Sequence, residues 1–151
     1  MSITVFTDGS CHNRLKSGGW AAIIFIGDEK VTLKGSEQDT THHRMELIAV
    51  LEALNFLEKK NLLSRPITIY SDSQYVVGLL QRQERLTASG YKTKKLKPIR
   101  NADLVQSMIY FFNATDLQFV KLKSHLKSSD PETVLNREVD LLSRQMMRTS
   151  S

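Results

Sequence analysis

The sequence predicts a mixed α/β fold in which helices pack on one five-stranded sheet. Three strand-like segments occupy the first third of the chain, the middle switches to the spacing of an amphipathic helix, and two later strand-like segments alternate with helices. Such alternation is typical of a sheet that includes parallel pairs. The length of 151 residues suits one domain, so we expect a single domain over residues 1–151.

The first three strands are expected to be antiparallel. Residues 3–7 alternate between side chains of high strand propensity and then meet Asp8-Gly9, a common turn signal. Residues 20–26 form an apolar run typical of a buried strand, and residues 30–34 alternate like a half-exposed strand. The Gly27-Asp28 pair between these two segments suits a tight hairpin.

The remaining segments alternate between helix and strand. Apolar residues recur at helical spacing from Leu47 to Leu57, and Thr41 or a neighbour can cap the start of that helix. In chain order, we then expect a strand at 66–70, helices at 73–81 and 103–112, a strand at 117–122 and a closing helix at 135–146.

The positive charge of the chain is concentrated in one segment. The formal net charge is +5, and residues 82–100 hold seven basic residues against one acidic residue, so the rest of the chain is nearly neutral. A local basic segment suggests a polyanionic partner and salt-sensitive binding, although a solvated charged face would give the same pattern.

Several classes of protein are excluded. The single cysteine, Cys11, excludes an internal disulfide framework and a cysteine-rich zinc site. The longest apolar run, residues 20–26, is far too short to cross a bilayer, and the first residues lack the features of a signal peptide. We therefore expect a cytoplasmic protein with no membrane association.

Four acidic residues stand where a site could form. Asp8 and Asp72 each follow a strand, Glu46 is expected in the first turn of the first long helix, and Asp140 lies in the closing helix. Carboxylates held close together repel one another, and divalent cations remove that repulsion. Two such cations could activate a water and stabilise the leaving oxygen of a phosphodiester. The alternative reading is that an aspartate after a strand is ordinary turn chemistry.

The short motifs around these acids resemble one enzyme family. They are Thr7-Asp8-Gly9-Ser10-Cys11, Arg44-Met45-Glu46-Leu47, Ser71-Asp72-Ser73-Gln74-Tyr75 and Asn136-x-x-x-Asp140. Together with the basic stretch that runs from Gly90 to Asp103, they are similar to ribonuclease HI (type 1 RNase H). The resemblance extends from about residue 3 to residue 145 in the order of the family.

This resemblance implies a fold and an activity. The family fold is a five-stranded mixed sheet, in which three antiparallel strands precede the parallel ones, with flanking helices. The family activity is metal-dependent cleavage of the RNA strand of RNA–DNA hybrids, which leaves 5′-phosphate and 3′-hydroxyl ends. The implied cofactor is a pair of Mg²⁺ ions, for which Mn²⁺ is expected to substitute. We expect a monomer, and no protein partner is implied.

The resemblance also implies roles for the acids. Asp8, Glu46, Asp72 and Asp140 would be the catalytic metal ligands. Asp8 would bridge both ions, Asp140 would help to hold the ion that activates water, and Glu46 and Asp72 would hold the ion near the leaving 3′-oxygen. His125 matches a histidine of the family's mobile loop, whose proposed role is proton transfer or product release.

A surface for the hybrid is implied as well. The basic segment corresponds to a basic protrusion at about 82–100 that grips phosphates of the DNA strand. Thr41 and Asn101 match residues that hold a DNA phosphate, and Gln74 matches a minor-groove contact. The implied substrate-binding residues are Cys11, Arg14, Thr41, His43, Ser73, Gln74, Asn101, Lys92, Lys94, Lys95 and Lys97.

The sequence departs from the family at some of these positions. Arg14 stands where the family often has Asn, and His43 stands where it has Asn or Gln, so discrimination between RNA and DNA is expected to be weaker or differently built. Tyr91 replaces a tryptophan that lines the DNA channel, so binding is expected to depend more on charge. His42 and His43 are neighbours at a helix start, and we expect them to point apart and contact nucleic acid instead of sharing a metal.

Three other functions remain open at this point. A DNA-processing nuclease or transposase-like domain would share the fold, but Asn136-x-x-x-Asp140 and the basic segment argue against it. A non-catalytic hybrid-binding module would be expected to lack one of the four carboxylates. A structural domain with a basic face would make the ordered motifs a coincidence.

Overall fold

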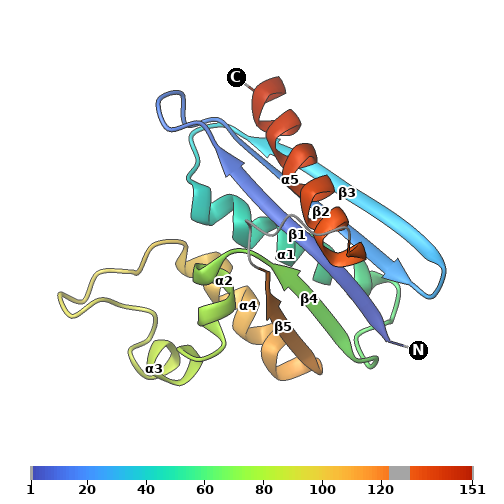
Figure 1. Ribbon diagram of the computed structural model, residues 1–151. Coiled ribbons are helices and arrows are strands. Elements are labelled where there is room, and N and C mark those ends of the chain that lie inside the picture. The colour runs from blue at the N-terminus through green and yellow to red at the C-terminus, as the bar shows by residue number, and fades with distance from the viewer. Residues whose placement is uncertain (1, 123–129, 151) are drawn as a thin grey trace.

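Five strands form one mixed sheet in the computed structural model, which describes residues 2–122 and 130–150. The spatial order of the strands is β3-β2-β1-β4-β5 (Figure 1). β1 pairs antiparallel with β2, β2 pairs antiparallel with β3, and β4 and β5 continue the sheet in parallel. The strands are β1 (Ile3–Cys11), β2 (Gly18–Ile26), β3 (Glu29–Glu37), β4 (Ile67–Ser71) and β5 (Leu117–Lys121). The predicted fold class is therefore confirmed.

The helices cover both faces of this sheet. They are α1 (His42–Lys59), α2 (Gln74–Leu79), α3 (Gln83–Ala88), α4 (Ala102–Ala114) and α5 (Pro131–Ser150). Ile3 and Val5 of β1 belong to the core shared with α1 and α4, whereas Phe6 packs in a second core with Val139 of α5. Because successive side chains of a strand point to opposite faces, α1 packs on one side of β1 and α5 on the other, and α4 packs against α1 in the first of these cores (Figure 1).

The turn predicted at Asp8-Gly9 is wrong. β1 continues through both residues to Cys11, because its ladder with β2 runs on from Asp8↔Ala21 to Cys11↔Gly18. Gly9 instead allows a close contact between two elements. A Cβ atom at this position would lie 2.5 Å from the backbone nitrogen of Glu46, so only glycine lets the backbone of α1 approach β1 this closely.

The local signals for the hairpin and for the first helix are confirmed. Gly27, with a φ of 60°, lies in the two-residue turn between β2 and β3. Thr41 is the N-cap of α1, and its hydroxyl accepts a hydrogen bond of 3.2 Å from the backbone N–H of Arg44. α1 begins at His42, so Glu46 lies in the second turn and not in the first as predicted.

The basic segment contains a short helix that the sequence pattern did not predict. α3 has no buried residue, so it lacks the apolar stripe from which a helix is recognised. The chain after α3 folds back on itself: Lys92 forms a β-bridge with Pro98, and the N–H of Ile99 donates to the carbonyl of Tyr91 over 3.0 Å. Figure 1 shows α3 and this loop extending from the side of the molecule beside α2 and α4.

Among the helices at residues 2–122 and 130–150, none is both long enough and apolar enough for a membrane span.

Candidate active site

Asp8 lies in the central strand on the face covered by α5. Phe6 and Ser10 point to the same face of β1, since they stand two residues before and after it. The N–H of Gly9 donates to Asp8 Oδ1 over 2.9 Å. Burial, the charge of Asp72 and a hydrogen bond with Asp140 raise the pKa of Asp8 to about 9, so this carboxyl is protonated at neutral pH.

Asp72 is placed beside Asp8 by the register of two parallel strands. Phe6 of β1 pairs with Tyr70 of β4, and each aspartate follows two residues later. Ser73 then caps α2 by accepting from the N–H of Val76 over 3.1 Å, which turns the chain sharply after Asp72. Burial, followed by the charges of Glu46 and Asp140, raises the pKa of Asp72 above its usual value.

Glu46 reaches the same point from α1. Its side chain is buried, and Gly9 brings its backbone against β1. Asp8, Glu46 and Asp72 each offer a carboxylate oxygen, and these three oxygens lie within 4.8 Å of one another. The strand register and the close contact at Gly9 therefore bring together three acids that are far apart in the sequence.

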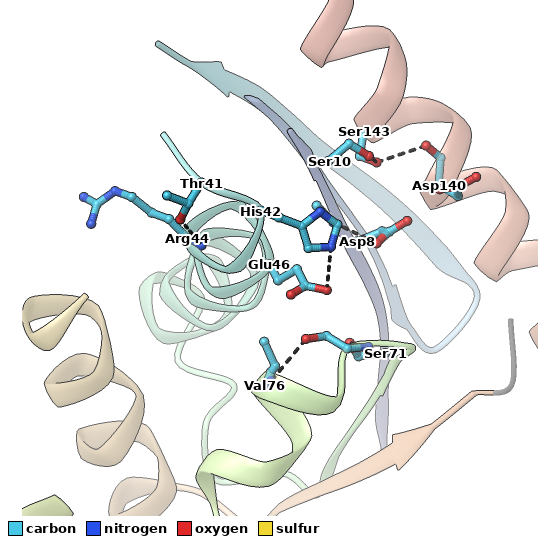
Figure 2. A network of polar contacts seen from close by, with 12 residues as sticks. Asp8, Ser10, Thr41, His42, Arg44, Glu46, Ser71, Val76, Asp140 and Ser143 are labelled. Atoms are coloured by element: carbon cyan, nitrogen blue, oxygen red, sulfur yellow. Dashed lines mark hydrogen bonds and ion pairs between the residues drawn. The ribbon is translucent and has the colours of Figure 1, made fainter. Parts of the chain in front are cut away.

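Asp140 approaches from α5 on the other side of Asp8. In Figure 2, Asp8 lies between Glu46 of α1 and Asp140 of α5. Besides its hydrogen bond with Asp8, Asp140 accepts at Oδ1 from Arg144 Nε over 3.2 Å, one helical turn later. All four predicted acids thus gather at one place, and each comes from a different part of the fold.

His42 lies beside the acids, whereas the sequence predicted for it only a contact with nucleic acid. Its Nε2 lies 3.2 Å from Glu46 Oε2, and this hydrogen bond raises the pKa of His42 against the opposing effect of its partial burial. The spacing of four residues from Glu46 is the signal that could have identified it, and the same spacing links Arg144 to Asp140.

His43 has a different partner from His42, but the two rings do not diverge fully, because they lie edge to face with a centroid distance of 6.3 Å. Its ring stacks on Tyr75 with a centroid distance of 4.2 Å and an interplanar angle of 7°. This stack borders a pocket of about 240 Å³ lined by Thr41, His42, His43, Tyr75, Arg100 and Asn101. Two predicted phosphate contacts, Thr41 and Asn101, therefore share one pocket beside the acids.

The acids open into a cleft of about 420 Å³. Its walls combine acidic, basic and small side chains, namely Asp8, Gly9, Ser10, Cys11, His42, Asp72, Asp140, Arg144, Met147 and Arg148. Cys11, predicted to contact the hybrid, lines this cleft, and its thiol donates to the carbonyl of Thr40 over 3.5 Å. Partial burial raises the pKa of that thiol.

The other predicted contact residues are more dispersed. Arg14 is exposed in the loop between β1 and β2, and Gln74 is exposed at the start of α2, where it accepts from Lys121 Nζ over 3.4 Å. Ser73 is buried, with its hydroxyl engaged in the cap of α2. The four lysines of the basic loop are exposed: Lys92, Lys94, Lys95 and Lys97. His125 lies outside the described residues.

The donor set suits hard divalent cations. The cationic side chains beside the acids pair with the outer two, His42 with Glu46 and Arg144 with Asp140. Burial, followed by the charges of Asp72 and Asp140, instead raises the pKa of the central carboxyl of Asp8 and favours its protonated form. Oxygen ligands in this crowded arrangement are those that Mg²⁺-like ions prefer, and such ions would relieve the repulsion.

Comparison of the sequence with known proteins gives one consistent result. The profile of a family described as RNase H matches residues 1–148. The chain is 32% identical over 148 residues to a protein of Caldicellulosiruptor saccharolyticus named Ribonuclease H, a match that covers 97% of this chain and 96% of that protein.

Solved structures share the fold. LC9-RNase H1, described as a type 1 RNase H with the type 2 active-site motif, superposes with a TM-score of 0.80 at 22% identity, covering 99% of this chain and 74% of that one. A foamy viral protease-reverse transcriptase, solved in complex with RNA/DNA hybrid, superposes with a TM-score of 0.77 at 21% identity. That match covers 97% of this chain but 20% of the longer viral chain.

Proposed function

The chain belongs to the RNase H family, a family of nucleases, and from this premise we propose that it hydrolyses the RNA strand of RNA–DNA hybrids. One observation carries the proposal: the carboxylate oxygens of Asp8, Glu46 and Asp72 lie within 4.8 Å of one another, and Asp140 is hydrogen-bonded to Asp8. Relatives named Ribonuclease H, and a structural neighbour in complex with RNA/DNA hybrid, support the same substrate.

We propose that the four carboxylates hold two divalent cations, which are Mg²⁺ ions with Mn²⁺ able to substitute. When bound, such a pair activates a water molecule and stabilises the charge on the leaving oxygen, which gives 5′-phosphate and 3′-hydroxyl ends. Asp8 must release its proton to take part, because burial and its neighbours hold that proton in the metal-free protein. Asp8 lies near Glu46 and Asp72 and also beside Asp140, so it would help to hold both cations. Asp140 would help to hold the cation that activates water, and Glu46 and Asp72 would hold the cation near the leaving 3′-oxygen.

The proposed substrate surface has three parts. The pocket that contains Thr41 and Asn101 is suited to a DNA phosphate, because hydroxyl and amide groups surround it together with Arg100. The exposed lysines of the basic loop add attraction to the DNA strand. The stack on Tyr75 holds the ring of His43 in place, and we propose that this ring contacts the groove of the hybrid.

Four further residues are proposed to act on the bound hybrid. Arg14 and Gln74 are proposed to read the minor groove, and Cys11 to contact the RNA strand near the acids. His125 is proposed to transfer a proton or assist product release.

Cleavage of an end-labelled RNA–DNA hybrid tests the proposed function. The assay uses Mg²⁺, Mn²⁺ or chelator, with RNA–RNA, DNA–DNA and single strands beside the hybrid. The test variant is Asp8→Asn. The matched control is Asp28→Asn, which removes an exposed carboxylate in the turn between β2 and β3. Circular dichroism establishes that both variants fold.

We expect metal-dependent cutting of the RNA strand of the hybrid, which Asp8→Asn abolishes and Asp28→Asn preserves. Salt-sensitive hybrid binding with no cutting under either metal would overturn the enzymatic proposal in favour of a binding module. Cutting of RNA–RNA at a comparable rate would overturn the proposed substrate class and direct attention to Arg14 and His43.

A further inference from the structure

Two buried serines connect β1 to α5 immediately beside the acids. The hydroxyl oxygens of Ser10 and Ser143 lie 2.8 Å apart, and the hydroxyl of Ser143 also donates to the backbone carbonyl of Asp140 over 3.0 Å (Figure 2). Ser143 is 0% exposed and Ser10 is 9% exposed. The pair therefore joins two elements that each carry one of the acids.

The direction of these hydrogen bonds follows from the proton count. A serine hydroxyl has a single proton, and a carbonyl oxygen can only accept. Ser143 gives its proton to the carbonyl of Asp140, so Ser10 must be the donor in the contact between the two hydroxyls. The result is a directed chain from Ser10 through Ser143 to the backbone of Asp140.

This chain encloses the contact between Asp8 and Asp140 from one side. Ser10 stands two residues after Asp8 on the same face of β1, and Phe6 stands two residues before it. Phe6 packs in the same core as Val139, the residue that precedes Asp140. The two acids therefore meet between an apolar contact on one side and the serine chain on the other.

Gly19 lets α5 approach the sheet closely beside the serine pair. It is the β2 partner of Ser10 in the ladder. A Cβ atom at Gly19 would lie 2.2 Å from the carbonyl oxygen of Ser143 and 2.3 Å from the backbone nitrogen of Met147. The backbone of α5 thus contacts β2 here, and the serine hydroxyls connect the same part of α5 to β1.

We propose that Ser10 and Ser143 are positioning residues that fix the separation of Asp8 and Asp140, and through it the affinity of the site for divalent cations. The inference rests on the proposed function in taking these acids as metal ligands. Hydrogen bonds within a helix set the spacing along its axis and leave its position on the sheet to contacts between the two elements. Here those contacts are the backbone approach at Gly19 to β2 and the serine pair to β1.

Calorimetry of Mn²⁺ binding to the protein alone tests the proposal. It compares the wild type with Ser143→Ala, Ser10→Ala and the double variant, and with Asp8→Asn to show that binding depends on Asp8. The matched control is Ser107→Ala on α4, whose hydroxyl makes the same kind of bond to the carbonyl of Asp103, over 3.2 Å. Hybrid cleavage at subsaturating and saturating Mn²⁺ is measured in parallel. Ser10→Ala breaks the same chain from the other end and keeps the test available if Ser143→Ala does not fold.

We expect Ser143→Ala to weaken Mn²⁺ binding by about 10–100-fold, the usual effect of removing a group that orients metal ligands. Ser10→Ala should also weaken Mn²⁺ binding, but by a smaller factor, because the hydroxyl of Ser143 still donates to the carbonyl of Asp140. The double variant should resemble Ser143→Ala, since both changes break one chain. KM for the hybrid should stay unchanged, and Ser107→Ala should bind Mn²⁺ like the wild type.

A lowered thermal stability with wild-type Mn²⁺ affinity would overturn the proposal and leave the serines a structural role. Equal losses in Ser143→Ala and Ser107→Ala would overturn it as well. If the wild type binds Mn²⁺ through Asp8 but cuts no hybrid, the proposed function fails while the affinity comparison still decides this inference. Absence of Asp8-dependent Mn²⁺ binding would overturn both the proposed function and the positioning role of the serines.

Discussion

The imidazole of His42 lies 3.2 Å from the carboxylate of Glu46, one turn further along α1. The imidazole is on the side of α1 that faces the other acids, and Figure 2 shows it between α1 and Asp8. When protonated, the imidazole places a positive charge against the buried carboxylate of Glu46. Its effect on the metal-free protein depends on pH.

The His42–Glu46 pair should stabilise the metal-free protein at low pH only. Because this contact raises the pKa of His42, its contribution is complete below the unfolded value of 6.5 and is lost as the pH rises through the higher folded value. His42→Ala should therefore lose stability at pH 5.5 and little at pH 9. The loss should stay below about 1 kcal/mol, because the exposed imidazole is screened by solvent. Urea unfolding with chelator measures it, and an equal loss at both pH values would contradict the assignment.

Asp8→Asn should stabilise the metal-free protein at neutral pH. The folded pKa of about 9 lies above the ordinary value of 3.8, so the folded state holds a proton that the unfolded state has lost. The free energy of unfolding of the wild type should thus fall as the pH rises between these values. The variant has no carboxyl to titrate there and should gain more than about 1.4 kcal/mol at pH 7.5, the equivalent of one pKa unit.

The free energies of unfolding of the wild type and of Asp8→Asn are compared from pH 3.5 to pH 9 with chelator present. Below the ordinary pKa the two proteins should converge, because Asp8 is then protonated in both states. Added Mg²⁺ should reverse the order by stabilising the wild type. An Asp8→Asn protein that is less stable at every pH would contradict the charge crowding inferred for this site.

Gly9→Ala should damage both stability and activity. The added methyl would lie 2.5 Å from the backbone of Met45 and Glu46 and must push α1 away from β1. We expect a loss of about 1–3 kcal/mol, as for other overpacked positions, and a fall in cleavage rate at temperatures where the variant is folded. The matched control is Gly78→Ala, since a Cβ atom there meets nothing nearer than the side chain of Arg82 at 3.8 Å.

Gly78→Ala should leave the free energy of unfolding unchanged or raise it by up to about 1 kcal/mol, because alanine is the better helix former. Unfolding midpoints and initial rates measure both variants. Wild-type activity in a folded Gly9→Ala protein would show that the site tolerates a displaced Glu46.

Removing two lysines of the basic loop should weaken hybrid binding in a salt-dependent way. Lys94→Ala/Lys95→Ala should lower the slope of log affinity against log salt by roughly one to two, since each lost phosphate contact contributes about 0.7–0.9. Lys59→Ala/Lys60→Ala, an adjacent exposed pair at the end of α1, is the matched control and should leave the slope unchanged. Fluorescence anisotropy with chelator present measures binding without cleavage, and equal slopes for both pairs would remove the loop from the binding surface.

Much of the fold was predictable because it depends on interactions between residues that are close in the sequence. The cap at Thr41 and the hairpin at Gly27-Asp28 depend on residues close in sequence, and both were found where predicted. The Asp8-Gly9 pair misled for the same reason. As a local signal it reads as a turn, but its glycine is required by the backbone of α1, which lies more than thirty residues away in the chain.

The strands, most of the helices and the motifs that contain the four acids were predictable, because hydrophobic period and capping act over a few residues. Which side chains share the site could not be predicted in this way, because it depends on contacts between distant segments. The parallel register of β1 and β4 sets Asp72 beside Asp8, Gly9 and Gly19 let α1 and α5 contact the sheet, and His42 faces the acids while His43 faces Tyr75. These contacts depend on helix docking and strand register. Both arise from packing between distant segments, which produces no periodic pattern in the sequence.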